Sequence, residues 1–574
     1  MFFPKLNELK QKAVTISSFA GLNCGPVTQN GEFAYMENLT SQGSPVLMPR
    51  PGRSIYHTTG CDGMIDKDAL CYVNQGSFVI NGTSVDMGLS SGEKQLVSMG
   101  AYVVIFPDKK YVNTLDLSDN GSLEAKFVSE GTVQITLCQE DGSEYEDMTV
   151  SAEAPEDPAD GQYWMDTATM ALKRYSASSE SWVSLVTTFV RLAAQGIGKD
   201  FSVGDGVTVS GVAAQALQGL NASTVIVDKS DDFLVIPGLV DSCVSQDPDQ
   251  GAITIERTVP EMDFVVESEN RLWGCRYGKD REGNIVNELY ACKLGDFKNW
   301  QCYQGLSTDS YRVSLGADGY FTGAVTYLGQ PTFFRENCLH KVYGTYPAEF
   351  QLQTTICRGV QLGSHKSLAQ VEGILYYKAT DGVYCYDGSM PTRLSRKLGN
   401  NYYHSAVGGF WGDKYYISMQ DKMTQSHLFV YDTQRHLWHR EDDLQVRHFC
   451  NRDDKLYAAA DTRIWVVAGK EGDEVVSWLA QTAPLSPEDP NRRYISRIIP
   501  RLLLEQGSRI RFSVRYDGKG GWYTLGTVTG AGLRSFSLPM ATRRCEFLEL
   551  RIQGVGKAKI YSLTLIKEQG SELL

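Results

Sequence analysis

Paired carboxylates are the first residues to consider, because two acids a short distance apart can cleave a glycosidic bond. Candidate acids lie near the starts of the repeat units described below, at Asp263, Glu267, Asp318 and Glu372. Nothing in their spacing selects a pair. The sequence also lacks the GxGxxG and GxxxxGK[ST] phosphate-binding loops and the HExxH zinc motif. We therefore predict that the chain is not an enzyme and that it needs no cofactor.

Four of the eight histidines lie close together in the sequence, at His427, His436, His439 and His448. The residues around them indicate the end of a β-hairpin, so we expect solvent-facing turn residues and no metal site. The thirteen cysteines contain no CxxC pair. We interpret them as buried free thiols of a protein that folds in a reducing cytoplasm.

Exposed aromatic rings could bind sugars by stacking. The candidates for glycan stacking are Trp164, Tyr175 and Trp182, and a second group is Tyr402 and Tyr403 beside Trp411. The alternative for the first three is that they form the main core of a small β module. The sequence leaves both interpretations open.

Arginines near the C-terminus form the most suggestive surface, because guanidinium groups pair bidentately with carboxylates and phosphates. The candidate interface or DNA-facing residues are Arg50, Arg492, Arg493, Arg497, Arg501, Arg509, Arg511, Arg515, Arg543 and Arg544. Two functions fit them, namely an interface with an acidic protein and contact with a nucleic-acid backbone. A solvated strand face is the alternative without a function. No motif that would read bases is present.

Charge is separated along the chain, whose net charge is −13. Residues 128–257 hold six Lys/Arg against twenty-one Asp/Glu, whereas residues 491–574 hold fifteen Lys/Arg against six. The net charges of these segments are therefore −15 and +9. Such opposition predicts that different parts of the molecule face different partners.

The elements that position these residues are predicted to be β-strands. Aromatic and β-branched strand pairs recur around Tyr72, Val103, Trp273, Phe333, Tyr376, Tyr415 and Tyr457. The last three intervals are 43, 39 and 42 residues, close to the length of a four-stranded propeller blade. The long gap before Trp273 shrinks to about 40 residues when the acidic segment is treated as an insertion. The predicted fold is all-β, with a six- or seven-bladed propeller at its centre.

We predict six regions. They are an extended N-terminal arm (1–60), first propeller blades (61–127), two inserted β modules (128–190 and 191–257), the remaining blades (258–470) and a C-terminal β-sandwich (471–574). In the sandwich, Ile510, Phe512, Val514 and Tyr516 alternate with Arg509, Arg511 and Arg515, so one strand face is apolar and the other basic. No secretory signal and no membrane-spanning apolar stretch is visible.

The N-terminal residues 19–53 resemble the opening of tailed-phage propeller proteins, especially the packaged-DNA stabilisation (tail hub or nozzle) family. The similar pieces are Gly21-Leu22-Asn23, Glu37-Asn38-Leu39 and Pro49-Arg50-Pro51-Gly52. The resemblance extends loosely over the predicted blades and the C-terminal sandwich, about three-quarters of the chain, and the acidic insertion departs from it. It implies a ring, commonly of six subunits, below the portal and its adaptors, where the protein plugs or extends the channel and retains packaged DNA.

From these features we predict a structural virion protein of a tailed phage, assembled in the host cytoplasm, with adaptor and tail-fibre proteins as neighbours. The alternative is a receptor- or glycan-binding tail-tip protein that uses the aromatic insertion. A propeller glycosidase is a third hypothesis.

Overall fold

The computed structural model describes residues 11–280, 283–316, 318–485, 494–541, 543 and 545–568. Strands occur throughout these ranges and the helices are short 3₁₀ turns, which confirms the all-β prediction. These turns are η1 (Gln215–Leu220), η2 (Pro248–Gln250), η3 (Pro347–Glu349), η4 (His365–Ser367) and η5 (Ser395–Leu398). In the described ranges there is no helix with the length and apolar character that crossing a membrane requires.

Nine sheets in the described part of the chain have four hydrogen-bonded strands, and the seven that lie outside the acidic segment share one design. In six of these seven the strands follow one another in chain order. Two of these sheets precede the acidic segment: β6 (Gly63–Lys67), β7 (Ala69–Asn74), β8 (Ser77–Ile80) and β9 (Thr83–Asp86); and β10 (Gln95–Met99), β11 (Tyr102–Phe106), β12 (Lys110–Asn113) and β13 (Asn120–Ser122). Two follow it directly: β27 (Phe264–Ser268), β28 (Arg271–Lys279), β29 (Ile285–Ala291) and β30 (Tyr311–Ser314); and β31 (Gly323–Tyr327), β32 (Gln330–Phe334), β33 (Cys338–Tyr343) and β34 (Gln351–Ile356). The last two are β35 (Ala369–Val371), β36 (Ile374–Ala379), β37 (Gly382–Tyr386) and β38 (Thr392–Arg393); and β39 (Tyr403–Trp411), β40 (Lys414–Asp421), β41 (Ser426–Asp432) and β42 (Leu437–Arg440).

The seventh sheet takes its fourth strand from the N-terminal region. It contains β43 (Val446–Arg452), β44 (Lys455–Ala460), β45 (Arg463–Ala468) and β5 (Ser54–His57), and Trp465 on β45 lies opposite Ile55 on β5.

The repeat residues found in the sequence occupy equivalent places in these sheets. Each lies on the second strand of its sheet and is buried: Tyr72, Val103, Trp273, Phe333, Tyr376, Tyr415 and Tyr457. Each four-stranded sheet needs an apolar side chain at this buried position, which is why the signal recurs once per sheet.

The chain divides into two compact units, which are described separately. Unit 1 contains Met1–Ser84, Phe333–Leu339 and Thr354–Leu574, and unit 2 contains Val85–Thr332 and His340–Gln353. Within unit 1, β43 contacts β6 and β39, and β39 contacts β35. Within unit 2, β27 contacts β10 and β31. In each unit, therefore, neighbouring sheets pack through their first strands.

The acidic segment lies within unit 2 and forms three sheets. The first contains β14 (Ala125–Val128), β26 (Thr254–Arg257), β21 (Gly206–Ser210) and β22 (Ser223–Val225). The second contains β23 (Asp228–Lys229), β24 (Phe233–Pro237), β20 (Phe189–Ala193), β15 (Val133–Cys138) and β25 (Val244–Gln246). The third contains β16 (Thr149–Ser151), β17 (Tyr163–Asp166), β18 (Ala171–Ser176) and β19 (Ser181–Ser184).

The expected boundary between two modules near residue 190 does not coincide with a boundary between these sheets. Strand β15 pairs with both β20 and β25, and one hydrophobic cluster extends from Val133 to Ile255. Strands from both sides of residue 190 thus share sheets and a core, because an isolated sheet with one apolar face must be covered by another.

Two five-stranded sheets near the C-terminus share one core and are called the C-terminal sandwich here. The first contains β1 (Gln11–Ile16), β53 (Ala558–Glu568), β47 (Tyr494–Leu504), β50 (Gly532–Ser535) and β51 (Leu538–Pro539). The second contains β2 (Phe33–Glu37), β46 (Ser477–Thr482), β52 (Leu548–Val555), β48 (Arg509–Tyr516) and β49 (Lys519–Thr529). The predicted alternation on β48 is confirmed, since Ile510, Phe512, Val514 and Tyr516 are all buried.

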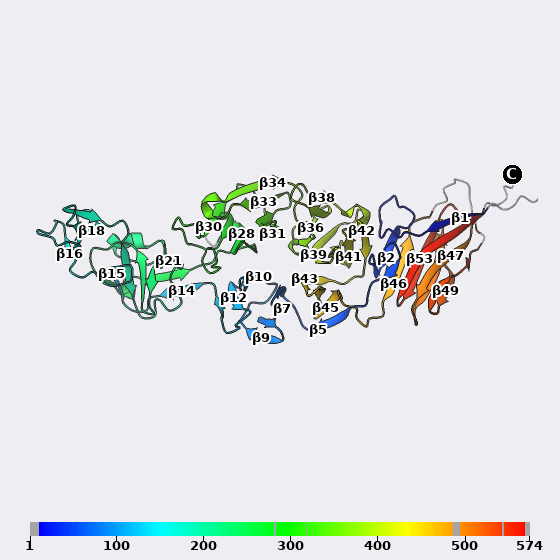
Figure 1. Cartoon of the computed structure of the whole chain (residues 1–574), viewed down its shortest axis with the longest axis horizontal. Helices are drawn as coiled ribbons and strands as arrows, with labels where there is room; N and C mark the ends of the chain where they lie inside the picture. Colours follow the sequence, from blue (N-terminus) through cyan, green and yellow to red (C-terminus); the bar gives the residue numbers. More distant parts are fainter. Residues whose placement is uncertain are drawn as a thin grey trace, which may run out of the picture. The chain divides into compact units, whose positions relative to one another are not determined.

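The described part of the predicted N-terminal arm is paired with distant strands. Strand β1 pairs with β53, β2 pairs with β46, and the short strands β3 (Leu39–Thr40) and β4 (Met48–Pro49) pair with each other. Figure 1 shows the blue strands β1 and β2 beside strands from the other end of the chain. The first ten residues lie outside the described ranges.

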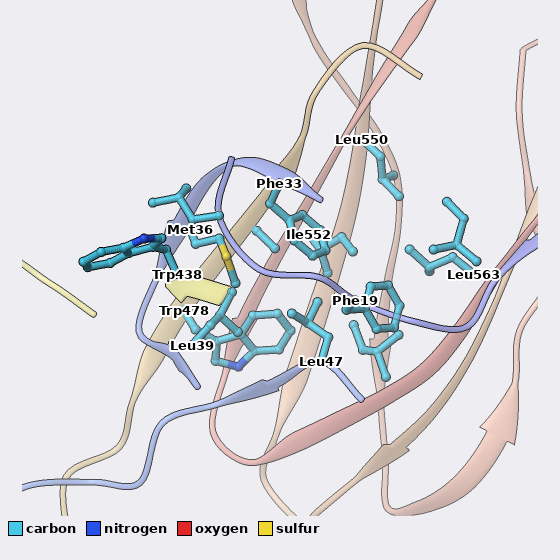
Figure 2. Close-up of a cluster of buried hydrophobic side chains, with 14 of the residues drawn as sticks. Phe19, Phe33, Met36, Leu39, Leu47, Trp438, Trp478, Leu550, Ile552 and Leu563 are labelled. Carbon is cyan, nitrogen blue, oxygen red and sulfur yellow. The ribbon is translucent and has the colours of Figure 1, made fainter. Parts of the chain in front are cut away.

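Apolar side chains fix this N-terminal segment (residues 11–57) in the core. Figure 2 shows Phe19, Phe33, Met36, Leu39 and Leu47 in one buried cluster, which also contains Trp438, Trp478, Leu550, Ile552 and Leu563. Fully burying each large apolar side chain contributes about 1.5–3 kcal/mol. The segment is therefore a structural part of unit 1.

All thirteen cysteines are free thiols, as predicted. Burial raises the pKa of several of them, for example that of Cys61 to about 12. Cys24 and Cys243 differ from the prediction because they are exposed.

Candidate functional site

The predicted arginine surface is divided between the two sheets of the C-terminal sandwich. Arg497 and Arg501 are exposed on β47, in the first sheet, whereas Arg509 and Arg511 are exposed on β48, in the second. Because the inner faces of the two sheets share one core, their outer faces point in opposite directions. Arg492, Arg493 and Arg544 lie outside the described residues.

The outer face of β48 gathers cations around one indole ring. The Arg551 guanidinium lies 4.0 Å from the centre of the Trp522 ring, and that of Arg515 lies 4.9 Å from it. Strand register brings them together, because β48 pairs with both β49 and β52. We call this surface the arginine–tryptophan face, made of Arg509, Arg511, Arg515, Trp522 and Arg551.

Only part of the charge on this face is neutralised within the chain. Arg515 donates to both carboxylate oxygens of Glu549, and this hydrogen bonding raises the pKa of Arg515. Desolvation, followed by repulsion from Arg515, lowers the pKa of Arg551. Arg551 donates from Nη2 to Gln481, and its buried Nε has no partner among the described residues. The face can therefore bind carboxylates or phosphates through Arg509 and Arg511 and stack a planar group beside Trp522.

Arg543 and Arg50 are placed differently. Arg543 is exposed, and its guanidinium lies 5.5 Å from the centre of the Tyr516 ring. Arg50 is buried and bonds Asn38 and Glu474, so its prediction as a surface or DNA-facing residue is wrong for this chain.

Arg50 belongs to a charge cluster with Arg53, Glu441, Asp442 and Glu474, in which the two arginines and Glu441 are buried, Asp442 is half-buried and Glu474 is exposed. Arg53 bonds Glu441 at 2.7 Å and Asp442 at 2.6 Å, and Arg50 bonds Glu474 at 2.9 Å. Burial raises the pKa of Glu441 even beside two arginines. Burial alone would also raise the pKa of Asp442, but attraction to Arg53 holds it below its ordinary value. The cluster fixes the N-terminal segment to the ends of β42 and β45.

The aromatic residues of the insertion do not form an open platform. Trp164 is buried and donates its indole N–H to the Ser151 carbonyl at 3.1 Å. Its ring contacts Trp182 edge-on at 5.3 Å, and Trp182 contacts Tyr175 at the same distance. Trp164 is thus too buried to stack on a sugar, whereas Tyr175 and Trp182 are half-buried. The hydrophobic core of this sheet contains Met165 and Leu172 instead.

Three of the four candidate acids make structural hydrogen bonds. Asp263 accepts from Arg276 and from the Tyr277 N–H, and Glu267 accepts from the Asn270 N–H. Glu372 lies in a turn and accepts from Gln434 at 2.6 Å. Asp318 is exposed.

The prediction of solvent-facing histidines is wrong for His439, which is buried on β42. Desolvation lowers the pKa of His439 to about 3, and neither ring nitrogen has a hydrogen-bond partner in the described part of the chain. The described residues contain no group of three His, Cys, Asp or Glu side chains suited to a metal ion.

One short sequence match to the GxSxG nucleophile motif is Gly88-Leu89-Ser90-Ser91-Gly92. That motif needs a strand-to-helix turn, but here it forms the loop between β9 and β10. Lys94 donates to Ser90 Oγ at 2.8 Å and also pairs with Asp108 at 2.7 Å. The loop therefore lacks the backbone geometry of the nucleophile motif, and Lys94 links Ser90 to Asp108 as a structural contact.

Two cavities in the structure were not predicted from the sequence. One, of about 240 Å³ in unit 1, is lined by Tyr402 and Tyr403 together with Lys378, whose pKa burial lowers to about 8. The other, of about 540 Å³ in unit 2, is lined by Tyr303, Tyr311 and Tyr346. These tyrosines come from different segments, so spacing along the chain gives no signal for them.

Comparisons with known proteins do not establish a family. No protein-family model matches the chain, and no curated protein matches it. Among solved structures, it is similar to an exo-β-1,3-galactanase from Phanerochaete chrysosporium (7% identity, TM-score 0.19, covering 52% of this chain and 94% of that one). It is also similar to a Trypanosoma rangeli sialidase (9% identity, TM-score 0.21, covering 96% of this chain and 95% of that one). A third similar structure is KlHsv2 (12% identity, TM-score 0.24, covering 51% of this chain and 94% of that one).

The sequence-based prediction that the chain is not an enzyme is corrected by these comparisons. Several of the similar solved structures are glycoside hydrolases and one is a sialidase. At these identities and TM-scores the likeness assigns no activity to this chain.

Proposed function

We propose that this chain is a structural virion protein of a tailed phage, a tail hub or nozzle below the portal and its adaptors that closes or extends the DNA channel. The observation that carries this proposal is the path of the N-terminal segment. Within unit 1 it pairs through β1 and β2 with the C-terminal sandwich and through β5 with the sheet β43–β45.

Paired strands at both ends of the N-terminal segment support a structural role in which the segment resists opening. Releasing residues 11–57 would break the ladders β1–β53, β2–β46 and β5–β45 and expose the cluster in Figure 2. A segment held by so many buried contacts opens only with the surrounding core. A component that must retain packaged DNA benefits from such resistance to opening.

The residues that carry the resemblance to the hub family have structural roles in this region. Gly21 has a φ of 78°, and a Cβ there would lie 2.4 Å from the Trp438 carbonyl oxygen. A Cβ on Gly52 would lie 2.6 Å from the Glu474 carbonyl oxygen. Between them, Arg50 joins the charge cluster. These close approaches give a physical reason for the glycines and for Arg50, and they support the resemblance.

The proposal includes a propeller and a ring of subunits. Seven four-stranded sheets with equivalent buried aromatic or β-branched residues support seven blades. The oppositely charged segments, −15 and +9, support contacts between copies in a ring, for which six subunits is the number that the resemblance implies. The arginine–tryptophan face is the proposed contact with an adaptor, a tail fibre or the DNA backbone.

The experiment is mass spectrometry and cryo-EM of phage particles produced from the genome that encodes this chain, with mass photometry of the purified protein. We expect the chain in purified particles, at the neck or tail, and a ring-sized oligomer in solution. A protein that is absent from particles and monomeric at micromolar concentration would refute the proposal.

A further inference from the structure

The cavity of about 540 Å³ in unit 2 has the composition of a ligand site. It is formed by the loop that leads into β30 and by the turn η3 between β33 and β34. Its volume lies within the range of natural ligand pockets, about 300–1,000 Å³. Its lining residues are Tyr303, Gly305, Leu306, Ser307, Asp309, Ser310, Tyr311, Arg312, Tyr346, Pro347 and Ala348.

Three tyrosine rings provide the walls. Tyr303 is 53% exposed, so its ring is accessible to a ligand. Tyr311 is held in place, because its ring packs edge-on against Phe350 at 5.0 Å. Tyr346 projects from the facing turn beside Pro347. Such rings offer flat apolar faces whose edges carry hydroxyl groups.

Two polar groups accompany the rings. Asp309 is 4% exposed; one carboxylate oxygen accepts the N–H groups of Gln304 and Leu306, and the other has no partner among the described residues. Arg312 donates to Glu288 through Nε and Nη2, at 2.8 Å each. Its third guanidinium nitrogen, Nη1, is not used in these two hydrogen bonds. The cavity therefore combines a hydrogen-bond acceptor, a donor and aromatic faces.

The cavity wall is fixed from behind by a buried arginine. Arg271 donates to the carbonyl oxygens of Ser307, Asp309 and Cys292 at 2.6–2.9 Å. Together with the two N–H bonds to Asp309, these contacts hold the loop in one conformation before any ligand arrives. A preformed site loses less entropy on binding than a mobile one.

We infer that this cavity binds a neutral oligosaccharide. Sugar rings present C–H faces that pack on tyrosine and hydroxyl groups that both donate and accept, which match Asp309 and Arg312. An anionic ligand is disfavoured, because Glu288 pairs with Arg312 and the Asp309 carboxylate offsets the charge of the buried Arg271, so the cavity has no excess of positive charge. The inference goes beyond the hub function, and its test does not depend on the position of the protein in a particle.

The test applies the purified full-length protein to an array of neutral and acidic glycans and confirms hits by saturation-transfer NMR with the same soluble oligosaccharides. We expect binding to neutral glycans. Tyr303→Ala and Tyr346→Ala should each weaken it by about tenfold, whereas Tyr303→Phe, which keeps the ring, should bind within about threefold of wild type. Asp309→Asn should also weaken binding, with an unchanged melting temperature confirming that the variant is folded.

Tyr320→Ala provides a matched control, because Tyr320 is 66% exposed in the same unit and does not line the cavity. It should bind like wild type. Absence of any neutral hit, hits restricted to acidic glycans, or binding that survives both tyrosine-to-alanine changes would each overturn the inference.

Discussion

Arginine serves two opposite purposes in unit 1. Arg50 and Arg53 are buried and pair with the carboxylates of Glu441, Asp442 and Glu474, so they join the N-terminal segment to distant parts of the chain. Arg509 and Arg511 lie on an outer sheet face, exposed to solvent. A buried guanidinium is committed to its neighbours, whereas an exposed one is available to a partner. The comparison teaches that strand register and burial, more than residue type, decide which arginines stabilise the fold and which are accessible to a binding partner.

Removing Arg53 should give the largest effect. Arg53→Met removes the closest partner of Glu441 and Asp442 and leaves only the more distant Arg50, at 3.9 Å and 3.5 Å, so we expect a loss of about 3 kcal/mol in the free energy of unfolding. Urea unfolding monitored by tryptophan fluorescence measures this loss. The matched control is Arg511→Met, which should change stability by less than about 0.5 kcal/mol. Equal effects of the two changes would erase the distinction between the two groups of arginines.

His439 provides a smaller effect that depends on pH. Its pKa is about 3 when folded, below the ordinary value of about 6.5 expected when unfolded. The unfolded chain binds the proton more readily than the folded one. The contribution of His439 to the free energy of unfolding is therefore fully present above pH 6.5 and is lost as the pH falls from 6.5 toward 3. The loss reaches about 2 kcal/mol at pH 5.

The change His439→Phe keeps a ring of similar shape and removes the titration. Unfolding curves at pH 7 and pH 5 should then differ by about 2 kcal/mol less than in wild type. An unchanged pH dependence in the variant would show that His439 is not a neutral buried group.

The exposed arginines should give the smallest effect on stability and a clear effect on binding. Arg509→Ala combined with Arg511→Ala should leave the melting temperature almost unchanged. If the face contacts the DNA backbone, the slope of log affinity against log salt for a short DNA duplex should decrease by about 2. Fluorescence anisotropy at several salt concentrations measures this slope. Wild-type binding without such a decrease would remove this face as the DNA contact.

The sequence predicted the elements of this fold better than its sites. Strand alternation around Phe512 and the recurrence of buried residues such as Tyr415 follow from local patterns, because side chains alternate along a strand and each sheet needs a similar core. The pairing of β1 with β53 was missed, since its partners lie at opposite ends of the chain. Arg50 was misplaced for the same reason: its burial depends on Glu441 and Glu474, which are distant in sequence.

The tyrosine cavity shows the same limit for a binding site. Tyr303 lies in the loop before β30 and Tyr346 precedes the turn η3, and neither local sequence has a motif. Trp164 and Trp182 gave a stronger sequence signal, but Trp164 is buried and its ring contacts Trp182 edge-on, so it offers no open ring face. An aromatic cluster in a sequence does not reveal whether a core or a surface needs it.

Native-state hydrogen exchange measured by mass spectrometry tests most directly whether the N-terminal segment is a structural part of unit 1. The amides of Phe33–Glu37 on β2 should exchange as slowly as those of Ser477–Thr482 on β46, because the two strands open only together. Rapid exchange of Phe33–Glu37 beside a protected β46 would contradict the account, since the segment would then be an arm that detaches without unfolding the core.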